Sequence, residues 1–582
     1  MRLNNEQERA MIFDAGALRI FGGPGTGKKE LAFRLLQREL ELKAPYRELL
    51  VLARSDDKVY QLESDLFRRI GNNRIRFSSI SEFLRGTFSY DEIIQPFQIR
   101  LLIKSILKKL PEDYIFRRAA WSDQMVREIE DLLNLLQTSL IPPEKLPEPD
   151  GNPLLKELKE IYFALEERID KLGFTTYPAA EAIIREKLTD KYRLIIVHDA
   201  QDLTPADYEL IKAISGEDTR LVLMGDIYRN IHRFEGTDPD IMRRRVETDF
   251  AGEMDTVYLD RSYTLGPGRI EFAHRLFGDE AEKYIPADGL GNDDVYFGEF
   301  PTDFEEVKAV ASRIEELVRG KDLIAPEEIA VAVRAPAVYG PRISRFLKLK
   351  GIPSDSPGSL FYNRSLVALV NKMKEIPEVK DSGDYIQCIE EEFDRILSEN
   401  LPSDEQISGM KYYITLAGSV LPPEELPDAL QPALEEAAYI PPDFDDAAVN
   451  IISIHHARFN RYKAVFIPHL NEGIFPSEVY HRYIFDPEFM EDLRKKTRGL
   501  LSYIERADLE KHLNEERRLF YTALSLPADR IYLSRSKISN GEEQNPSLFL
   551  YEMGILPPGR EPLTKNWTEV VSTMLPLPDK AE

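Results

Sequence analysis

A glycine-rich loop offers the clearest chemistry in this sequence. Residues 22–29 read GGPGTGKK, after the apolar run 17–21 and before a stretch with apolar residues at helical spacing. Glycines let backbone N–H groups converge on phosphate oxygens, and a helix N-terminus adds positive potential. The order strand, loop, helix favours this phosphate-binding motif over a glycine-rich turn that contains a lysine by chance. We expect nucleotide contacts from Gly22, Gly23, Gly25, Thr26, Gly27, Lys28 and Lys29.

The residue after Lys28 departs from the motif. Such loops carry a Ser or Thr there, whose hydroxyl holds Mg²⁺, whereas the Lys29 ammonium supplies no oxygen ligand. Lys29 either neutralises phosphate charge directly or points into solvent. We therefore expect ATP to be the cofactor, Mg²⁺ binding to be impaired, and hydrolysis to be a separate question from binding.

Gln7 has two interpretations. Its amide can bond both edges of adenine, which would add it to the nucleotide contacts. Asn4 and Gln7 also have the spacing of a helix capping box, and taken alone the cap is the favoured interpretation.

Composition limits the class of partner. The 582 residues are too many for one core, and their net charge is −25. A protein that holds nucleic acid on an open basic face should be basic, so any such contact must lie inside a local cleft. A soluble acidic protein without a nucleic-acid partner is the alternative. The single cysteine, Cys388, excludes internal disulfides and fits a reducing, cytoplasmic compartment. Neither a leader pattern nor a membrane-spanning apolar run is present, so we expect no membrane partner.

The order of elements predicts an α/β fold with parallel sheets flanked by helices. Buried-type strands are expected at 17–21, 49–54, 194–199 and 220–226, and a second set at 255–263, 328–334, 449–457, 463–470 and 529–536. The expected segments are a first core at 1–84 and 191–265, a helical insertion at 85–190, a second core at 266–370 and 448–555, a reduced helical insertion at 371–447 and a tail at 556–582.

Seven stretches, in order, resemble the motifs of the UvrD/Rep/PcrA-like superfamily 1 DNA helicases. They are LNNEQ (3–7), GGPGTGKK (22–29), RLIIVHDAQDLTPADYEL (193–210), VLMGDIYRNIHRFEGT (222–237), EIAVAVRAPAVYGPRISRFLKLKGIPSDSPGSLFY (328–362), IISIHHARFNRYKAVFIPHLNEGIFPS (451–477) and EERRLFYTALSLPADRIYLS (515–534). The resemblance implies two RecA-like P-loop NTPase cores, ATP between them, and single-stranded DNA across both. The second insertion is much shorter than is usual in the family.

The same resemblance implies that the catalytic positions are substituted. The metal-binding aspartate falls at His198, the water-orienting glutamate at Asp199, and the glutamine that senses the γ-phosphate at Arg229. Two arginine positions fall at Thr264 and Leu526. The residues that approach the ribose fall at Phe459, Asn460 and Arg461. Arg229, Arg261 or Arg461 could partly replace a missing cation.

The rate effects of the substituted contacts favour loss of hydrolysis over loss of nucleotide binding. One oxyanion-type contact is worth about 10²–10³ in rate, and an arginine finger about 10³–10⁵. Such losses are not additive, yet several together should leave almost no turnover. Lys28, the glycines and Gln7 remain, so nucleotide binding can persist.

The DNA-contacting positions are altered as well. Arg54 stands where the family has a stacking aromatic, and Phe83 belongs to the next matching motif. His232 and Phe234 keep stacking capacity, although ordinary packing under a loop explains them almost equally well. His455 is the remaining candidate contact, and ordering of its own loop is its simpler role.

Three hypotheses follow. The preferred one is a helicase-fold protein with little or no ATPase activity, acting as a binding or scaffolding partner in a DNA-repair or recombination assembly. The second is an active but divergent ATP-dependent helicase. The third is a nucleotide sensor in which Lys28 and Lys29 together stand in for the metal.

Overall fold

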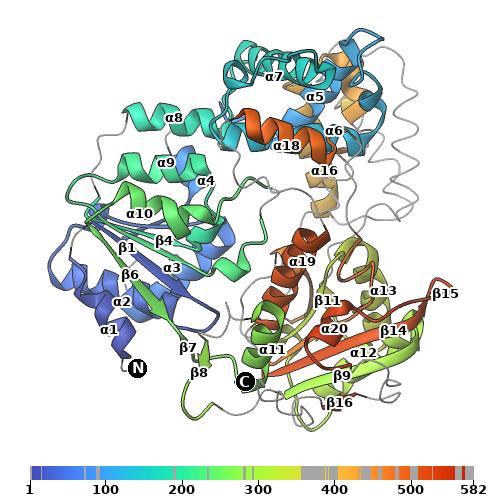
Figure 1. The fold of residues 1–582 in the computed structure, drawn as a ribbon. Coiled ribbons are helices and arrows are strands. Elements are labelled where there is room, and N and C mark those ends of the chain that lie inside the picture. The colour runs from blue at the N-terminus through green and yellow to red at the C-terminus, as the bar shows by residue number, and fades with distance from the viewer. Residues whose placement is uncertain are drawn as a thin grey trace, which may run out of the picture.

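The computed structural model describes two large sheets, a small sheet of β7 (Arg261–Ser262) and β8 (Ile285–Pro286), and the helices around them (Figure 1). The described residues are 3–14, 16–70, 74–86, 92–187, 192–232, 235–278, 284–290, 294–355, 387–388, 391, 404–429, 432–433, 447–456, 462–478, 484–497, 509–526, 529–556 and 567–569.

The first sheet is parallel, with strand order β3-β2-β4-β5-β1-β6. Its strands are β1 (Ala17–Gly22), β2 (Leu49–Ala53), β3 (Arg76–Ser79), β4 (Leu194–His198), β5 (Arg220–Gly225) and β6 (Met254–Leu259). Successive residues of β2 contact opposite layers. Leu49 and Val51 pack with one set of helices, while Leu50 and Leu52 pack with the other. The continuous apolar strands therefore reflect a sheet that is buried on both faces.

Helices cover both faces of this sheet. One layer holds α1 (Asn5–Ile12), α2 (Lys28–Glu41) and α3 (Asp56–Ile70). The other holds α4 (Ile80–Arg85), α8 (Tyr177–Lys187), α9 (Pro205–Ile214) and α10 (Val246–Asp249).

The second sheet has the order β11-β12-β10-β13-β14-β9-β16. Its strands are β9 (Asp294–Thr302), β10 (Ile329–Val333), β11 (Ser354–Asp355), β12 (Val449–Ser453), β13 (Ala464–Ile467), β14 (Arg530–Ser539), β15 (Glu542–Glu543) and β16 (Thr568–Glu569). The pairs that involve β15 and β16 are antiparallel. One face is covered by α12 (Asp303–Arg319) and α13 (Pro336–Leu349), and the other by α11 (Pro267–Phe277), α19 (Leu509–Leu524) and α20 (Leu548–Glu552).

A separate helical body lies above both sheets in Figure 1. Its elements are α5 (Pro96–Lys109), α6 (Asp123–Thr138), α7 (Pro153–Lys171), α16 (Asp404–Gly418) and α18 (Pro487–Lys496), and their apolar side chains form one core. Segments from both expected insertions thus share a single core. The α18 helix falls within the range expected for the second core, but it packs here because Phe489 and Leu493 are buried in this cluster.

The predicted fold class is confirmed: parallel sheets flanked by helices, with helical segments inserted. The expected strands at 17–21, 49–54, 194–199 and 220–226 correspond to β1, β2, β4 and β5. Two strands were not predicted: β9, where Gly298 and Pro301 interrupt the apolar pattern, and β3, a short edge strand. The strand expected at 255–263 in the second set belongs instead to the first sheet, as β6. Among the described helices, none combines the length and apolar character that crossing a bilayer requires.

Candidate nucleotide-binding site and cleft

Four neighbouring strands of the first sheet end at one edge, and the residues that follow them form the candidate site. Phe21 of β1 pairs with Gly225 of β5, and Met224 of β5 pairs with His198 of β4. Strand β2 lies next to β4. The register therefore brings together the glycine loop, Asp226, Asp199 and the start of α3.

The glycine loop needs its glycines. Gly25 and Gly27 have φ angles of 69° and 89°, a region that L side chains rarely adopt. A Cβ at Gly25 would also overlap with the Thr264 hydroxyl. The loop leads into α2, and Gly27 caps that helix without a side-chain bond. Glycines with positive φ directly before a helix N-terminus are features of a phosphate-binding loop.

Lys28 is folded back over this loop. Its Nζ donates to the carbonyl oxygen of Gly23 at 2.8 Å and to that of Gly22. Burial lowers the pKa of Lys28 to about 8, although the nearby Asp226 carboxylate opposes the shift. A bound phosphate would stabilise the ammonium and so compensate for the hydration that burial removes.

The structure confirms the capping interpretation of Gln7, and its contact with adenine stays a prediction. Asn4 and Gln7 form the capping box at the start of α1. The Gln7 Nε2 atom also donates to the carbonyl oxygen of Thr26 at 3.2 Å. The side chain is buried, so the helix cap places the amide directly against the loop.

Lys29 points away from Lys28. Its ammonium pairs with Asp65 of α3, and its side chain is 45% exposed. The two lysines therefore do not form the joint cation that the third hypothesis requires.

The cation at this site comes instead from Lys58, in the first turn of α3. The Lys58 ammonium pairs with the Asp199 carboxylate, which also lies 3.2 Å from Nδ1 of His198. Burial by itself would raise the pKa of Asp199. The Lys58 ammonium and His198 outweigh burial and hold that pKa well below its usual range. Asp199 is thus a carboxylate already neutralised from within the protein.

Asp226 is a second buried carboxylate, at the end of β5. Its Oδ1 accepts from the backbone N–H of Tyr228 at 3.1 Å, while Oδ2 is buried without a hydrogen bond to any described residue. Burial raises its pKa, against the attraction of Lys28 and Arg229. Arg229 thus lies close enough to influence both buried carboxylates.

Few side chains here offer the oxygen ligands that a divalent metal needs, and impaired Mg²⁺ binding stays a prediction. Mg²⁺ requires several oxygen ligands in octahedral geometry. The loop offers Lys29 where a hydroxyl belongs, His198 replaces a carboxylate, and Asp199 is occupied by Lys58. Within the described ranges, no group of three or more His, Cys, Asp and Glu side chains has the arrangement of a metal site.

The two substituted arginine positions are joined by a different arginine. Arg269 of α11 donates to the backbone oxygens of Thr264 at 3.0 Å and of Leu526 at 3.1 Å. It is only 4% exposed, and the Leu526 side chain is fully buried. Arg269 therefore joins the two segments structurally. Of the other candidate replacements, Arg261 pairs with Asp288 on the surface.

Aromatic rings cover the loop from outside. The Tyr284 ring would lie 2.7 Å from a Cβ at Gly23, so only glycine fits beneath it. Tyr284 belongs to a cluster with Tyr228, Phe277 and Tyr521. Since Tyr228 follows β5 and Tyr521 lies on α19, the cluster joins the two cores beside the site.

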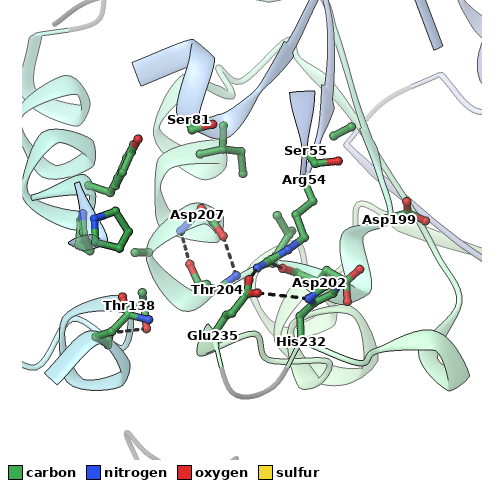
Figure 2. A pocket seen from close by; sticks show the side chains of 18 of the residues that line it. Arg54, Ser55, Ser81, Thr138, Asp199, Asp202, Thr204, Asp207, His232 and Glu235 are labelled. Atoms are coloured by element: carbon green, nitrogen blue, oxygen red, sulfur yellow. Dashed lines mark hydrogen bonds and ion pairs between the residues drawn. The ribbon is translucent and has the colours of Figure 1, made fainter. Parts of the chain in front are cut away.

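A cavity of about 1240 Å³ opens from Asp199 and Lys58 towards the helical body and the second core. Figure 2 shows the part of it around Arg54, His232 and Glu235. Eight acidic and six basic residues line it: Asp56, Glu130, Asp131, Glu181, Asp199, Asp202, Asp207 and Glu235, with Arg54, Lys58, Arg85, Arg100, Arg127 and Arg229. Arg54 pairs with Glu235, and Arg100 pairs with Glu130. The cleft is therefore not a basic channel.

The candidate DNA-contacting residues are distributed unevenly. Arg54, His232 and His455 line the cavity. Phe83 does not, because α4 turns its ring into the core of the first sheet, where it is 2% exposed and lies under Arg76 at 4.5 Å. Phe234 lies outside the described residues, as do 459–461.

Four residues of the site were not predicted from the sequence: Lys58, Asp226, Arg269 and Tyr284. Asp226 could have been predicted, because it follows Gly225 in the motif at residues 222–237. Lys58 carries no local signal, since its partner Asp199 is 141 residues away.

Two parallel-sheet cores, one with a phosphate loop at its strand ends, define a P-loop NTPase architecture of the RecA-like type. Two family models match this chain: the UvrD/REP helicase N-terminal domain at residues 3–250 and the UvrD-like helicase C-terminal domain at 424–537. The chain belongs to the UvrD/Rep helicase family.

Named relatives agree with this assignment. The chain is 21% identical to a Bacillus subtilis protein called putative ATP-dependent DNA helicase YjcD, over 96% of this chain and 82% of that protein. It is 24% identical to ATP-dependent DNA helicase UvrD2 of Mycobacterium tuberculosis over 58% of this chain, and 22% identical to ATP-dependent DNA helicase PcrA of Staphylococcus aureus over 66%. Those two matches span 52% and 53% of the relatives' lengths, about half of each.

Proposed function

We propose that this UvrD/Rep homologue binds ATP at the glycine loop and hydrolyses it slowly or not at all. One observation carries the proposal: Asp199, at the position expected to orient water, is paired with Lys58 and flanked by His198. A carboxylate held by an internal ammonium is poorly placed to activate water or bind a metal. Loss of contacts of this kind costs about 10²–10³ in rate for each one.

The same proposal makes the protein a binding or scaffolding subunit in DNA repair or recombination. Its relatives are named as ATP-dependent DNA helicases, and single-stranded DNA is the ligand we assign to the cleft. Arg54, His232 and His455 support that assignment from the cleft wall. The single cysteine fits a cytoplasmic setting.

The test measures binding and turnover separately. A fluorescent ATP analogue reports binding, and phosphate release in Mg²⁺, with and without single-stranded DNA, reports turnover. We expect wild type to bind and Lys28→Ala to bind at least about tenfold more weakly. Both should release phosphate at the background rate. Lys171→Ala, which removes a surface ion pair with Glu167, is the matched control.

A divergent ATP-dependent helicase is the second candidate, and Asp226 favours it. This buried carboxylate lies near Lys28 and Arg229, so an acid and a cation do flank the loop in addition to Asp199 and Lys58. If this candidate is right, phosphate release rises with single-stranded DNA and is lost in Lys28→Ala and Asp226→Asn alike. That result would refute the preferred proposal.

A further inference from the structure

The position of Lys28 identifies one end of the glycine loop. In phosphate-binding loops the lysine reaches the β- and γ-phosphates, while backbone N–H groups hold the α- and β-phosphates. The Lys28 ammonium lies at the carbonyl oxygens of Gly22 and Gly23, to which it donates. The end of the loop at these two glycines is therefore where the terminal phosphate of a nucleotide would lie.

The Tyr284 ring covers this end of the loop. Its Cε1 and Cζ atoms would lie 2.7 and 2.8 Å from a Cβ at Gly23, so the ring packs directly on the glycine backbone. A phosphate that reaches this end of the loop competes with the ring for the same space. The ring therefore limits how many phosphates the loop can hold while the protein keeps this arrangement.

Tyr284 is held in place by its neighbours. Strand β8 pairs with β7, and the N–H of Ile285 donates to the carbonyl oxygen of Asp260 at 2.8 Å. The carbonyl oxygen of Tyr284 lies 3.1 Å from Nε2 of His274 on α11. The Tyr284 ring meets that of Tyr228 edge-on, with centroids 6.3 Å apart. Moving the ring off the loop therefore sacrifices its packing in the aromatic cluster.

The charges beside the ring do not favour a third phosphate. Asp226 is 2% exposed, and its Oδ2 forms no hydrogen bond with any residue that the structure describes. Desolvation raises the pKa of the Tyr284 hydroxyl well above its usual range, and the Asp226 carboxylate raises it further, so the phenol stays neutral. The nearby cations Lys28 and Arg229 already interact with Asp226. Their attraction for a terminal phosphate is thus partly cancelled by this carboxylate.

We propose that Tyr284 determines which nucleotide the site prefers: its ring occupies the position of the terminal phosphate, so that the loop binds a nucleoside diphosphate more tightly than a triphosphate. A diphosphate needs only the backbone N–H groups of the loop and the N-terminus of α2, and it leaves the ring in place. A triphosphate must displace the ring. This inference rests on the proposed nucleotide binding and refines it, because ATP binds at a cost that ADP does not incur.

The experiment is a calorimetric titration of the full chain with ADP and, separately, with the non-hydrolysable ATP analogue adenylyl imidodiphosphate, both in Mg²⁺. We expect wild type to bind ADP about tenfold more tightly than the analogue. Tyr284→Leu keeps an apolar side chain for the aromatic cluster but lacks the two ring atoms nearest Gly23. Its affinity for the analogue should rise about tenfold, whereas its affinity for ADP should stay within about threefold of wild type.

Matched variants separate the ring from other effects. Tyr284→Phe keeps the ring and should keep the preference for ADP. Tyr551→Leu removes a ring that is 39% exposed on α20, and it should bind both ligands as wild type does. If Tyr284→Leu does not fold, Tyr284→Met takes its place, because its flexible side chain can vacate Gly23. The wild-type comparison needs no variant and can overturn the inference alone.

The outcomes distinguish this inference from the function on which it rests. Wild-type affinity for the analogue that equals or exceeds that for ADP overturns the role of Tyr284 and leaves nucleotide binding intact. A ratio of the two affinities that is unchanged in Tyr284→Leu does the same. If neither ligand binds wild type, the proposed function is wrong, and this inference is wrong with it.

Discussion

At the scale of single residues, the charge of Lys28 decides whether the loop attracts phosphate. Burial lowers its pKa to about 8, from 10.5 in a solvated lysine. The folded protein without nucleotide therefore loses the Lys28 proton as the pH rises through about 8, whereas the unfolded chain keeps it up to about pH 10.5. This group thus disfavours folding below about pH 8, and the cost diminishes as the pH rises through that window.

Nucleotide binding should have the opposite dependence on pH. Because only the ammonium attracts phosphate, we expect ATP affinity to be constant up to about pH 8 and then to fall towards about tenfold per pH unit. Titrations at several pH values measure this. Lys28→Arg, whose guanidinium remains charged, should show no such fall. A wild-type affinity that is flat through pH 9.5 would contradict a buried, titrating Lys28.

At the scale of elements, one partly buried ion pair holds three parts of the second core together. Arg334, just after β10, bonds both carboxylate oxygens of Glu516 on α19, at 2.7 and 2.9 Å. Glu516 also accepts from the backbone N–H of Ser477 at 3.0 Å. Burial opposes ionisation of Glu516, but its pKa is lowered, with Arg334 the main partner.

Removing one partner should cost more than removing both. Arg334→Ala leaves the buried Glu516 carboxylate without its cation, and we expect a loss of about 3 kcal/mol in the free energy of unfolding of the second core. Replacing the pair by Met and Leu should recover part of that loss. Urea unfolding followed by circular dichroism measures it. Equal losses in the single and double variants would show that the pair itself stabilises the core.

At the scale of the whole molecule, the two cores meet through the aromatic cluster beside the loop. Tyr228 stacks obliquely on Phe277 at 5.2 Å, and Phe277 meets Tyr521 edge-on at 5.3 Å. We expect Tyr228→Ala to loosen the cores and increase the radius of gyration measured by small-angle scattering. Tyr551→Ala, at a partly exposed ring on α20, is the control. An unchanged radius would mean that other contacts set the arrangement.

If single-stranded DNA occupies the cleft, as we propose, its affinity should depend on the charges of the cleft wall. Glu235 holds Arg54 and lies 3.4 Å from Nδ1 of His232. Glu235→Gln should free Arg54 for phosphate, tighten single-stranded DNA binding at low salt by about tenfold, and steepen its dependence on salt. Fluorescence anisotropy measures both effects, with Glu148→Gln on an exposed loop as control. No change in either would argue against DNA in this cleft.

Local sequence patterns were sufficient to predict many of the helices and strands of this protein. The strand–loop–helix order around residues 17–41 depends on neighbours in the chain, so apolar spacing and glycine content predict it. The same holds for β2, β4 and β5, which are continuous apolar runs, and for the capping box at Asn4. The weaker elements β3 and β9 were missed, because an edge position and an interrupted pattern leave little local signal.

The sequence by itself determined the fold class, the phosphate loop and the substitutions at His198, Arg229 and Leu526. Only the tertiary structure decided which cation meets which carboxylate. Strand order brings the Lys58 ammonium to the Asp199 carboxylate, and the packing of α2 beside α3 pairs Lys29 with Asp65. The orientation of α4 buries Phe83 in the core. The physical reason is range: backbone preferences act within a few residues, whereas a salt bridge forms between any two charges that the folded chain brings within a few ångströms.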